Sequence, residues 1–264
     1  MRQGSGVLEK NISSLAGEHG CASEESEESA VRDGIPQWKR AFDIIGASLC
    51  LVAASPILLV SALLIKCVSR GPVFFKQERI GHRGKTFVMW KLRTYEVSAG
   101  THDHKEYLTK IIVDSQNRDN TAEIPMVKMD DHPGIIPGVG FLLRKLCIDE
   151  IPQLFNVLLG DMSLVGPRPA MSYEVKEYSP WQFKRLHAMP GMTGLWQVSG
   201  KNRLSFNEMV NLDLKYWEKK SPLLDIKILL KTPWAIAMQI YDCLTGSHES
   251  PQPIPSTVLA SKSA

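Results

Sequence analysis

The sequence predicts an α+β fold, in which a re-entrant N-terminal membrane helix hairpin, a small β-hairpin and amphipathic interfacial helices surround a compact domain. Three observations support this fold class. No charged residue occurs between Ile44 and Ile65. Two strand-like segments then flank a turn that is bounded by Gly81 and Gly84. Helical patterns dominate the chain from about residue 140 to about residue 245.

We expect four segments along the 264 residues: a disordered acidic tail (1–35), a re-entrant membrane helix (36–70), a compact domain (71–245) and a flexible C-terminal tail (246–264). The first 36 residues hold seven acidic and three basic side chains, although the whole chain has a net charge of +3. This Ser/Glu/Gly-rich stretch buries too little apolar surface to offset its ordering entropy, so we expect it to be disordered. An acidic docking arm is the alternative.

The uncharged run from Ile44 to Ile65 is long enough to cross a membrane. As a helix it would extend about 33 Å, and the hydrocarbon core of a bilayer is about 30 Å thick. A secretory signal peptide fits poorly, because a long acidic tail precedes the run and no small-residue cleavage site follows it. A buried core helix is the other alternative.

Two details favour a helix that enters and leaves through the same leaflet over one that spans the bilayer. Ser55-Pro56 lies in the middle of the run, where proline removes a backbone hydrogen bond and bends the helix. Basic residues lie on both sides, with Lys39-Arg40 before the run and Lys66 and Arg70 after it. Because basic flanks prefer the cytoplasmic side, a bend at Ser55-Pro56 satisfies both clusters.

The soluble part reads as strands followed by helices. We expect two strands within residues 71–95, a helix from about Asp149 to Leu159, and a turn-rich segment after it. A further helix is expected around residues 172–188, then a loop with a short strand at 189–202, and helices at 205–220 and 222–244. The last helix carries Trp234 and few charges, so it suits either the membrane interface or the domain core.

Several common site motifs are missing from the sequence. It contains no G-x-x-x-x-G-K-[ST] loop, no G-x-G-x-x-G fingerprint, no G-x-S-x-G elbow and no H-E-x-x-H. The five cysteines are scattered and form no C-x-x-C pair, which argues against a disulfide framework and a zinc site. We expect no nucleic-acid partner. What remains is a set of carboxylates among cations.

The stretch "RKLCIDEIPQLFN" places two acids side by side at Asp149-Glu150. As structure, Asp149 suits an N-cap, Glu150 the first turn of a helix, and Pro152 is tolerated there. As chemistry, an Asp held close to several cations stays ionised and can attack phosphorus. A neighbouring Glu can hold Mg²⁺, which binds carboxylate and phosphate oxygens together.

Cations surround this pair in the sequence. Arg144 lies five residues before Asp149, and Lys91 and Arg93 follow one another closely at the end of a predicted strand. In "VGPRP", Arg168 stands between two prolines that restrict its backbone, which suits bidentate binding of a phosphate. A phosphate-bearing substrate is therefore expected, and the membrane helix implies that one substrate is a lipid.

Four segments together resemble the bacterial sugar transferase family, the monotopic polyprenyl-phosphate phosphoglycosyl transferases. They are "KRAFDIIGASLCLVAASPILLV", "GPVFFKQERIGHRGKTFVMWKLRTY", "LRKLCIDEIPQLFNVLLGDMSLVGPRP" and "MPGMTGLWQVSGKNRLSF", in the family's order and over about residues 38 to 240. The resemblance implies transfer of a sugar 1-phosphate from a UDP-sugar to undecaprenyl phosphate, with release of UMP. It also implies a catalytic domain on the cytoplasmic face of a bacterial inner membrane, and a role in the first membrane step of exopolysaccharide, capsule or O-antigen synthesis.

The resemblance also implies roles for individual residues. Asp149 matches the family's nucleophile, which would form a phosphosugar-enzyme intermediate, and Glu150 matches the residue that would bind Mg²⁺. Ser55-Pro56 matches the family's helix break and Lys39-Arg40 its interfacial anchor. Phosphate-binding cations are expected at Lys91, Arg93, Arg144, Arg168, Lys201 and Arg203, of which Arg93 rests on its position in "WKLRT".

The sequence departs from the family's pattern at several positions. Tyr95 stands where Met is usual, "DDHPGIIPGVG" lacks a common Arg, Lys201 replaces an Arg, and Cys147 replaces a frequent Ser. None of these changes removes the acid pair or Arg168, so an active enzyme is expected. The alternative is a catalytically weak, membrane-tethered scaffold or regulator of the same fold. A homodimer is plausible for such a surface-associated enzyme.

Overall fold

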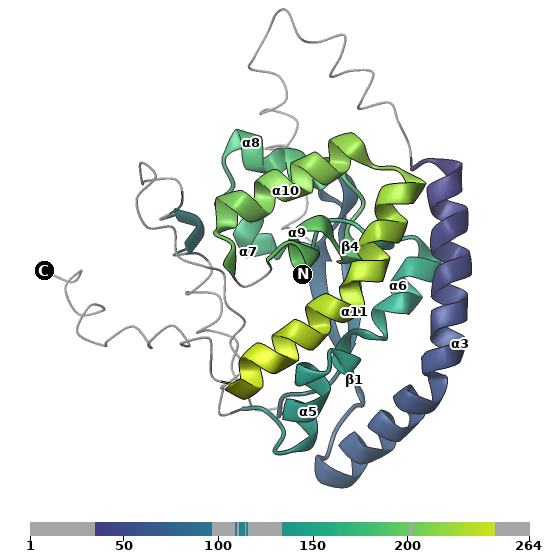
Figure 1. Cartoon of the computed structure of the whole chain (residues 1–264). Helices are drawn as coiled ribbons and strands as arrows, with labels where there is room; N and C mark the ends of the chain where they lie inside the picture. The colour runs from purple at the N-terminus through teal and green to yellow at the C-terminus, as the bar shows by residue number, and fades with distance from the viewer. Residues whose placement is uncertain are drawn as a thin grey trace, which may run out of the picture.

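The computed structural model describes residues 35–96, 109, 111–113, 115, 134–200 and 203–245. The N-terminal tail up to residue 34, the C-terminal tail from residue 246 and Lys201 lie outside the described residues. The described residues contain both helices and strands and begin with one long apolar helix, as the predicted fold class requires. Figure 1 shows this helix, α3, along one side of the molecule, with α10 and α11 across another face.

Helix α3 (Gln37–Val68) is one continuous helix of 32 residues. It is long and apolar enough to cross a membrane, and only 11% of its most apolar window is buried against the rest of the protein. A core helix of a soluble protein would be mostly buried, so this alternative does not hold. A helix with this much exposed apolar surface indicates a membrane protein.

The middle of α3 shows why Ser55-Pro56 bends the helix without ending it. Pro56 has no N–H to donate to the carbonyl of Val52, one turn earlier. The Ser55 hydroxyl donates to that carbonyl instead, at 2.8 Å. The helix therefore continues through Pro56, and Figure 1 shows that it changes direction in its second half. The structure thus has one bent helix, and its re-entry through the same leaflet stays a prediction.

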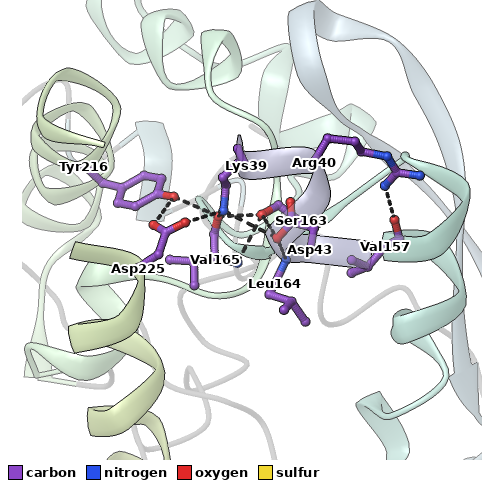
Figure 2. Close-up of polar contacts among 9 residues, drawn as sticks. All are labelled: Lys39, Arg40, Asp43, Val157, Ser163, Leu164, Val165, Tyr216 and Asp225. Carbon is purple, nitrogen blue, oxygen red and sulfur yellow. Dashed lines mark hydrogen bonds and ion pairs between the residues drawn. The ribbon is translucent and has the colours of Figure 1, made fainter. Parts of the chain in front are cut away.

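The N-terminal end of α3 is joined to the domain by a buried polar network (Figure 2). The Lys39 ammonium donates to Asp225 Oδ2 at 2.6 Å and to the Val165 carbonyl at 3.0 Å. The Tyr216 hydroxyl donates to Asp225 Oδ1 at 2.8 Å and to the same Val165 carbonyl at 3.0 Å. Asp43 accepts from the Leu164 N–H at 3.0 Å. Lys39 is 5% exposed and Asp225 is fully buried.

This network changes the role expected for Lys39-Arg40. Lys39 is buried, and Arg40 donates to the carbonyls of Val157 and Leu158 at 2.6 Å each, at the end of α6 (Gln153–Leu159). Both cations are therefore bound to groups of the protein, Lys39 buried and Arg40 half-buried. They join α3 to the domain, and the charge argument for re-entry loses one of its two basic flanks.

The C-terminal end of α3 packs on the same domain. Ile65 forms a buried cluster with Leu92 and Leu143. Arg93 donates to the Ser69 carbonyl at 3.0 Å and to the Pro72 carbonyl at 2.7 Å, just after the helix. Both ends of α3 are thus held by one body of protein.

The β-hairpin is confirmed. Strands β1 (Phe74–Ile80) and β2 (Thr86–Leu92) pair antiparallel, with Lys91 opposite Phe75. The turn between them is a short 3₁₀ segment, η1 (His82–Gly84), in which Arg83 takes a positive φ of 54°.

A second sheet was not predicted. Strands β3 (Ser163–Val165) and β4 (Gly191–Thr193) pair in parallel; β3 lies in a segment that reads as turn, and β4 lies where a short strand was expected, within residues 189–202. The backbone there is packed so closely that a Cβ on Gly191 would clash with the backbone of Gly166. Strands of three residues are too short to show an alternating pattern, which explains why the sequence indicates neither β3 nor its pairing with β4.

Helices form the rest of the domain, and one expected helix is broken. The segment around 172–188 is split, because Pro180 cannot donate to the preceding turn and Ser179 N–H donates to Gln182 Oε1 to start a new helix. Helix α10 begins at Ser205, which shares a capping box with Glu208. The helices are α5 (Val139–Lys145), α6, α7 (Ser172–Val175), α8 (Pro180–Phe183), η3 (Lys184–His187), α9 (Leu195–Val198), α10 (Phe206–Lys219) and α11 (Pro222–Thr245).

The buried Lys39–Asp225 pair leads to a stability prediction. Replacing Lys39 with Met should lower the free energy of unfolding by about 3 to 5 kcal/mol, because it leaves the Asp225 carboxylate buried without its cation. Denaturant unfolding of the protein in detergent micelles measures this change. The matched control is Lys66→Met, which removes an exposed lysine from the other end of α3 and should cost less than about 0.5 kcal/mol. Equal losses in the two variants would contradict the prediction.

Candidate active site

The acid pair lies in a tight 3₁₀ segment, η2 (Ile148–Glu150), between α5 and α6. Glu150 N–H donates to the Cys147 carbonyl at 3.3 Å, and Ile151 N–H donates to the Ile148 carbonyl at 3.2 Å. Helix α6 begins only at Gln153, with Pro152 at its N-cap. The expectation that Asp149 caps a helix running from Asp149 to Leu159 was therefore wrong. Pro152 has no N–H and its ring clashes with the preceding turn, so α-helical bonding starts after it.

Lys91 is brought to the acid pair, as predicted from the sequence. Asp149 is 3% exposed, while Glu150 is half-buried. The Lys91 ammonium lies 2.8 Å from Glu150 Oε1. The pair joins β2 to η2, so a cation from the β-hairpin lies beside the two carboxylates.

Asn156, which the sequence did not suggest, fixes α6 against β2. Its Oδ1 accepts from the Trp90 N–H at 3.0 Å and its Nδ2 donates to the Val88 carbonyl at 2.7 Å. The fully buried side-chain amide thus pairs with the outer edge of β2 as a neighbouring strand would. This holds η2 next to Lys91. A lone Asn inside an apolar helix is the only sequence sign of such a role.

The segment around Arg168 is held through its backbone carbonyls. The two flanking prolines have no N–H, so carbonyl groups provide most of the anchoring. Each carbonyl from residue 167 to 170 accepts a hydrogen bond from a distant part of the chain. The donors, in order, are Gly191 N–H (2.8 Å), Arg185 Nη2 (3.4 Å), Arg79 Nη1 (3.1 Å) and Ile80 N–H (2.8 Å).

Arg79 is a site residue that sequence reasoning missed. It is 2% exposed, and its Nε and Nη2 both donate to Gln77 Oε1, at 3.2 and 2.8 Å. Burial, and next the charge of Arg168, lower the pKa of Arg79 to about 10, and the charge of Glu150 acts in the opposite direction. Arg79 therefore lies close enough to both Arg168 and Glu150 to interact with them. The signal in the sequence was a Gln and an Arg on the same face of "FFKQERI".

Arg144 lies in the last turn of α5, and the residue that departs from the family's pattern contacts it. The Arg144 guanidinium carbon is 4.9 Å from the centre of the Tyr95 ring. An aromatic face attracts a guanidinium and restricts its orientation. Tyr95, which stands where the family usually has Met, thus restricts the orientation of the Arg144 guanidinium.

Two other expected cations are placed elsewhere. Arg93 is 4% exposed and all its guanidinium nitrogens bind the chain after α3, through Ser69, Arg70 and Pro72. These contacts give Arg93 a structural role in place of the phosphate-binding role that was expected. Arg203 is mostly exposed, and its Nη2 lies 3.4 Å from Asp242 Oδ2.

Arg203 lines a groove of about 420 Å³ between α9 and α11. The groove joins cations to an aromatic side chain and apolar surface, with Gln197, Lys231, Trp234 and Met238 among the lining residues. An oxygen of Gln197 approaches Gly194, which packs on the carbonyl of Gly166, two residues before Arg168. Gln197 thereby links the groove to the segment that leads into Arg168.

The acid pair fits a magnesium ion that is shared with a substrate. Within the described residues, no three His, Cys, Asp or Glu side chains are grouped as a site made by protein alone. Mg²⁺ in phosphate-handling sites takes one or two carboxylates and completes its shell with phosphate oxygens and water. Asp149 and Glu150 offer such carboxylates.

A buried carboxylate beside the Lys91–Glu150 ion pair, on a domain joined to a membrane helix, suits anionic, phosphate-bearing substrates. Comparison with known protein families identifies the class: residues 35–239 match the bacterial sugar transferase family. The chain belongs to this family and is an enzyme. The resemblance inferred from the sequence motifs is therefore confirmed.

Curated relatives agree with this assignment. An exopolysaccharide production protein ExoY from Sinorhizobium fredii is 38% identical over 76% of this chain and 85% of its own length. An undecaprenyl-phosphate galactose phosphotransferase from Salmonella typhimurium is 39% identical over 74% of this chain. A UDP-glucose:undecaprenyl-phosphate glucose-1-phosphate transferase from Klebsiella pneumoniae is 38% identical over 74%. The match covers 39% of each of the last two proteins.

The backbone at Cys147 gives a prediction for the site. Cys147, directly before η2, is in the left-handed region with φ 56° and ψ 20°. Replacing Cys147 with Val should lower the free energy of unfolding by about 1 to 2 kcal/mol relative to Cys147→Gly, because a β-branched side chain is strained there and glycine is not. Denaturant unfolding compares the two variants. The same pair of changes at Cys67, inside α3, should favour Val over Gly. A Cys147→Val protein as stable as Cys147→Gly would contradict this reading of the turn.

Proposed function

We propose that the protein transfers a sugar 1-phosphate from a UDP-sugar to undecaprenyl phosphate and releases UMP, through a phosphosugar intermediate on Asp149. The observation that carries the proposal is the buried Asp149 in η2, directly before Glu150, whose carboxylate lies 2.8 Å from the Lys91 ammonium. The names of the relatives, which include exopolysaccharide production and undecaprenyl-phosphate phosphotransferases, support it. We assign the reaction to the first membrane step of exopolysaccharide, capsule or O-antigen synthesis.

The proposed chemistry has two displacements at the same phosphorus. In the first, a carboxylate oxygen of Asp149 attacks the phosphorus next to the sugar, and the bond to the bridging oxygen breaks. UMP leaves with that electron pair, and an acyl phosphate remains on Asp149. In the second, an oxygen of undecaprenyl phosphate attacks this phosphorus and expels the carboxylate. The product is a sugar-diphospho-lipid, and the free carboxylate of Asp149 is regenerated.

The surrounding cations support both steps by binding the negative charge of the phosphate oxygens. Lys91 lies beside Glu150, and Arg168 is held with a fixed backbone that suits bidentate contact with a phosphate. Arg144 is oriented by Tyr95 for a similar contact. Glu150, with Asp149 next to it, would hold Mg²⁺, which when bound neutralises part of the diphosphate charge.

The nucleotide part of the donor is assigned to the groove between α9 and α11. Arg203 and Lys231 supply positive charge there and Trp234 an aromatic face, which together suit a uridine diphosphate. Lys201 stays a predicted phosphate ligand next to the groove. The identity of the transferred sugar is not assigned, since one relative is named for galactose and another for glucose.

We further propose that α3 is re-entrant and that the domain lies on the cytoplasmic face of the inner membrane. Both ends of α3 bind the same domain, at Lys39 and at Ile65. A straight span would place those ends on opposite sides of the bilayer. Exposed Leu223 and Leu230 on α11 suit an interfacial helix. A homodimer stays a prediction.

The covalent mechanism predicts a specific product pattern. Protein given a UDP-hexose and Mg²⁺ without lipid acceptor should release UMP, limited to one equivalent, and should retain the labelled sugar phosphate. Asp149→Asn should release none, because the amide cannot attack phosphorus. UMP release and protein-bound radiolabel measure the two outcomes, with Asp161→Asn as a matched change of an Asp outside the pair. UDP as the product would instead indicate transfer of sugar alone. Wild-type protein that is inert with UDP-glucose, UDP-galactose and their N-acetylated forms would favour a scaffold.

The re-entrant helix predicts the same sidedness for both of its ends. Single cysteines at Gln37 and Arg70, in a chain otherwise free of cysteine, should both be protected from a membrane-impermeant maleimide in intact cells. Both cysteines should react with the maleimide after the membrane is permeabilised. An engineered cysteine on a periplasmic loop of another membrane protein is the positive control for labelling. Reaction of only one end in intact cells would show a spanning helix.

A further inference from the structure

Two buried arginines, Arg79 and Arg185, donate hydrogen bonds to the backbone at Arg168 and Pro169, and they differ in whether a carboxylate pairs with them. Arg185 donates to the Arg168 carbonyl and forms an ion pair with Asp213 at 2.6 Å, so its charge is compensated locally. Arg79 donates to the Pro169 carbonyl and to the neutral side chain of Gln77. Among the residues that the structure describes, no carboxylate forms an ion pair with Arg79. Its positive charge is buried without a directly bound anion.

The position of Arg79 in the fold brings its positive charge close to Arg168. Ile80, the next residue, pairs with Ala170 through its N–H at 2.8 Å, so the end of β1 is bound to the chain on the far side of Arg168. Arg168 lowers the pKa of Arg79, which means that the two guanidinium groups repel each other. Glu174 and Glu150 offset this repulsion only from a distance. A phosphate group bound by Arg168 would offset both charges at once.

We propose that Arg79 is a positioning residue for the donor diphosphate: it fixes the backbone next to Arg168 through the Pro169 carbonyl, and it adds a buried positive charge near Arg168. The inference rests on the proposed function, because it assigns the anion at Arg168 to the donor phosphates. Arg79 acts through Arg168 and does not itself bind the donor, since it is 2% exposed and its donors are directed at Gln77 and Pro169.

A double-mutant cycle tests whether Arg79 acts through Arg168. Initial UMP release is measured over a range of concentrations of the UDP-hexose that the wild-type enzyme uses best. Arg79→Gln should lower kcat/KM by about 10- to 100-fold, mainly through a higher KM, because a charge-assisted interaction with the donor is weakened. The Arg79→Gln/Arg168→Gln double variant should be within about twofold of Arg168→Gln alone, since the two residues act as one unit.

Two further variants keep the test decisive. Arg83→Gln removes an exposed arginine from the turn of the same hairpin and should keep wild-type KM and kcat. If Arg79→Gln does not fold, the cycle is repeated with Arg79→Lys, which keeps the charge but lacks the three-nitrogen guanidinium fork that contacts Gln77 and Pro169. The decrease in kcat/KM that Arg79→Lys causes in the wild-type background should be absent when Arg168 is already replaced by Gln.

The outcomes separate this inference from the proposed function. Multiplicative losses in the double variant, or a wild-type KM in Arg79→Gln, would overturn the positioning role while leaving Asp149-dependent UMP release intact. A loss confined to thermal stability would overturn it as well, because it would show an ordinary structural arginine. Wild-type protein that forms no Asp149-dependent UMP would overturn the proposed function, and this inference with it.

Discussion

The buried contact between Lys39 and Asp225 is the interaction on which the rest of the structure depends. It joins the first turn of the membrane helix α3 to α11, and the same ammonium donates to the carbonyl of Val165. Val165 ends β3 and is followed directly by Gly166, Pro167 and Arg168. Lys39 thus links the membrane helix to the strand that leads into Arg168, a predicted phosphate ligand. The net contribution of such a pair is modest, but breaking one half of it is costly.

A second constraint is the lack of N–H groups around Arg168. A short loop between two prolines forms few backbone hydrogen bonds of its own, so the fold supplies a donor for each carbonyl from residue 167 to 170. These donors come from β1, η3 and β4, which are far apart in the sequence. The loop is rigid because several elements meet at it. This arrangement suits a site where phosphate must be bound at a defined distance from Asp149.

The sequence predicted features that depend on local chemistry or on long patterns. The apolar run of α3, the β-hairpin with its glycine turn, the acid pair and the proximity of Lys91 were all readable in this way. The roles of Arg93, Lys39 and Arg40 were not, because a cation near a membrane segment or a strand end looks the same in sequence whether it binds phosphate, lipid or the protein itself. Arg79 was missed for the same reason. The β3–β4 sheet and the late start of α6 depend on tertiary packing and on a single proline.

The way α3 is attached also changes what counts as a domain in this protein. Cutting the chain after residue 70 would remove Lys39 and Asp43, the partners of Asp225 and of the Leu164 N–H. It would also expose the apolar surface that Ile65 and Ala47 cover. The domain is therefore not an independent unit to which an anchor has been added, because the first turns of α3 complete its buried polar network and its apolar core.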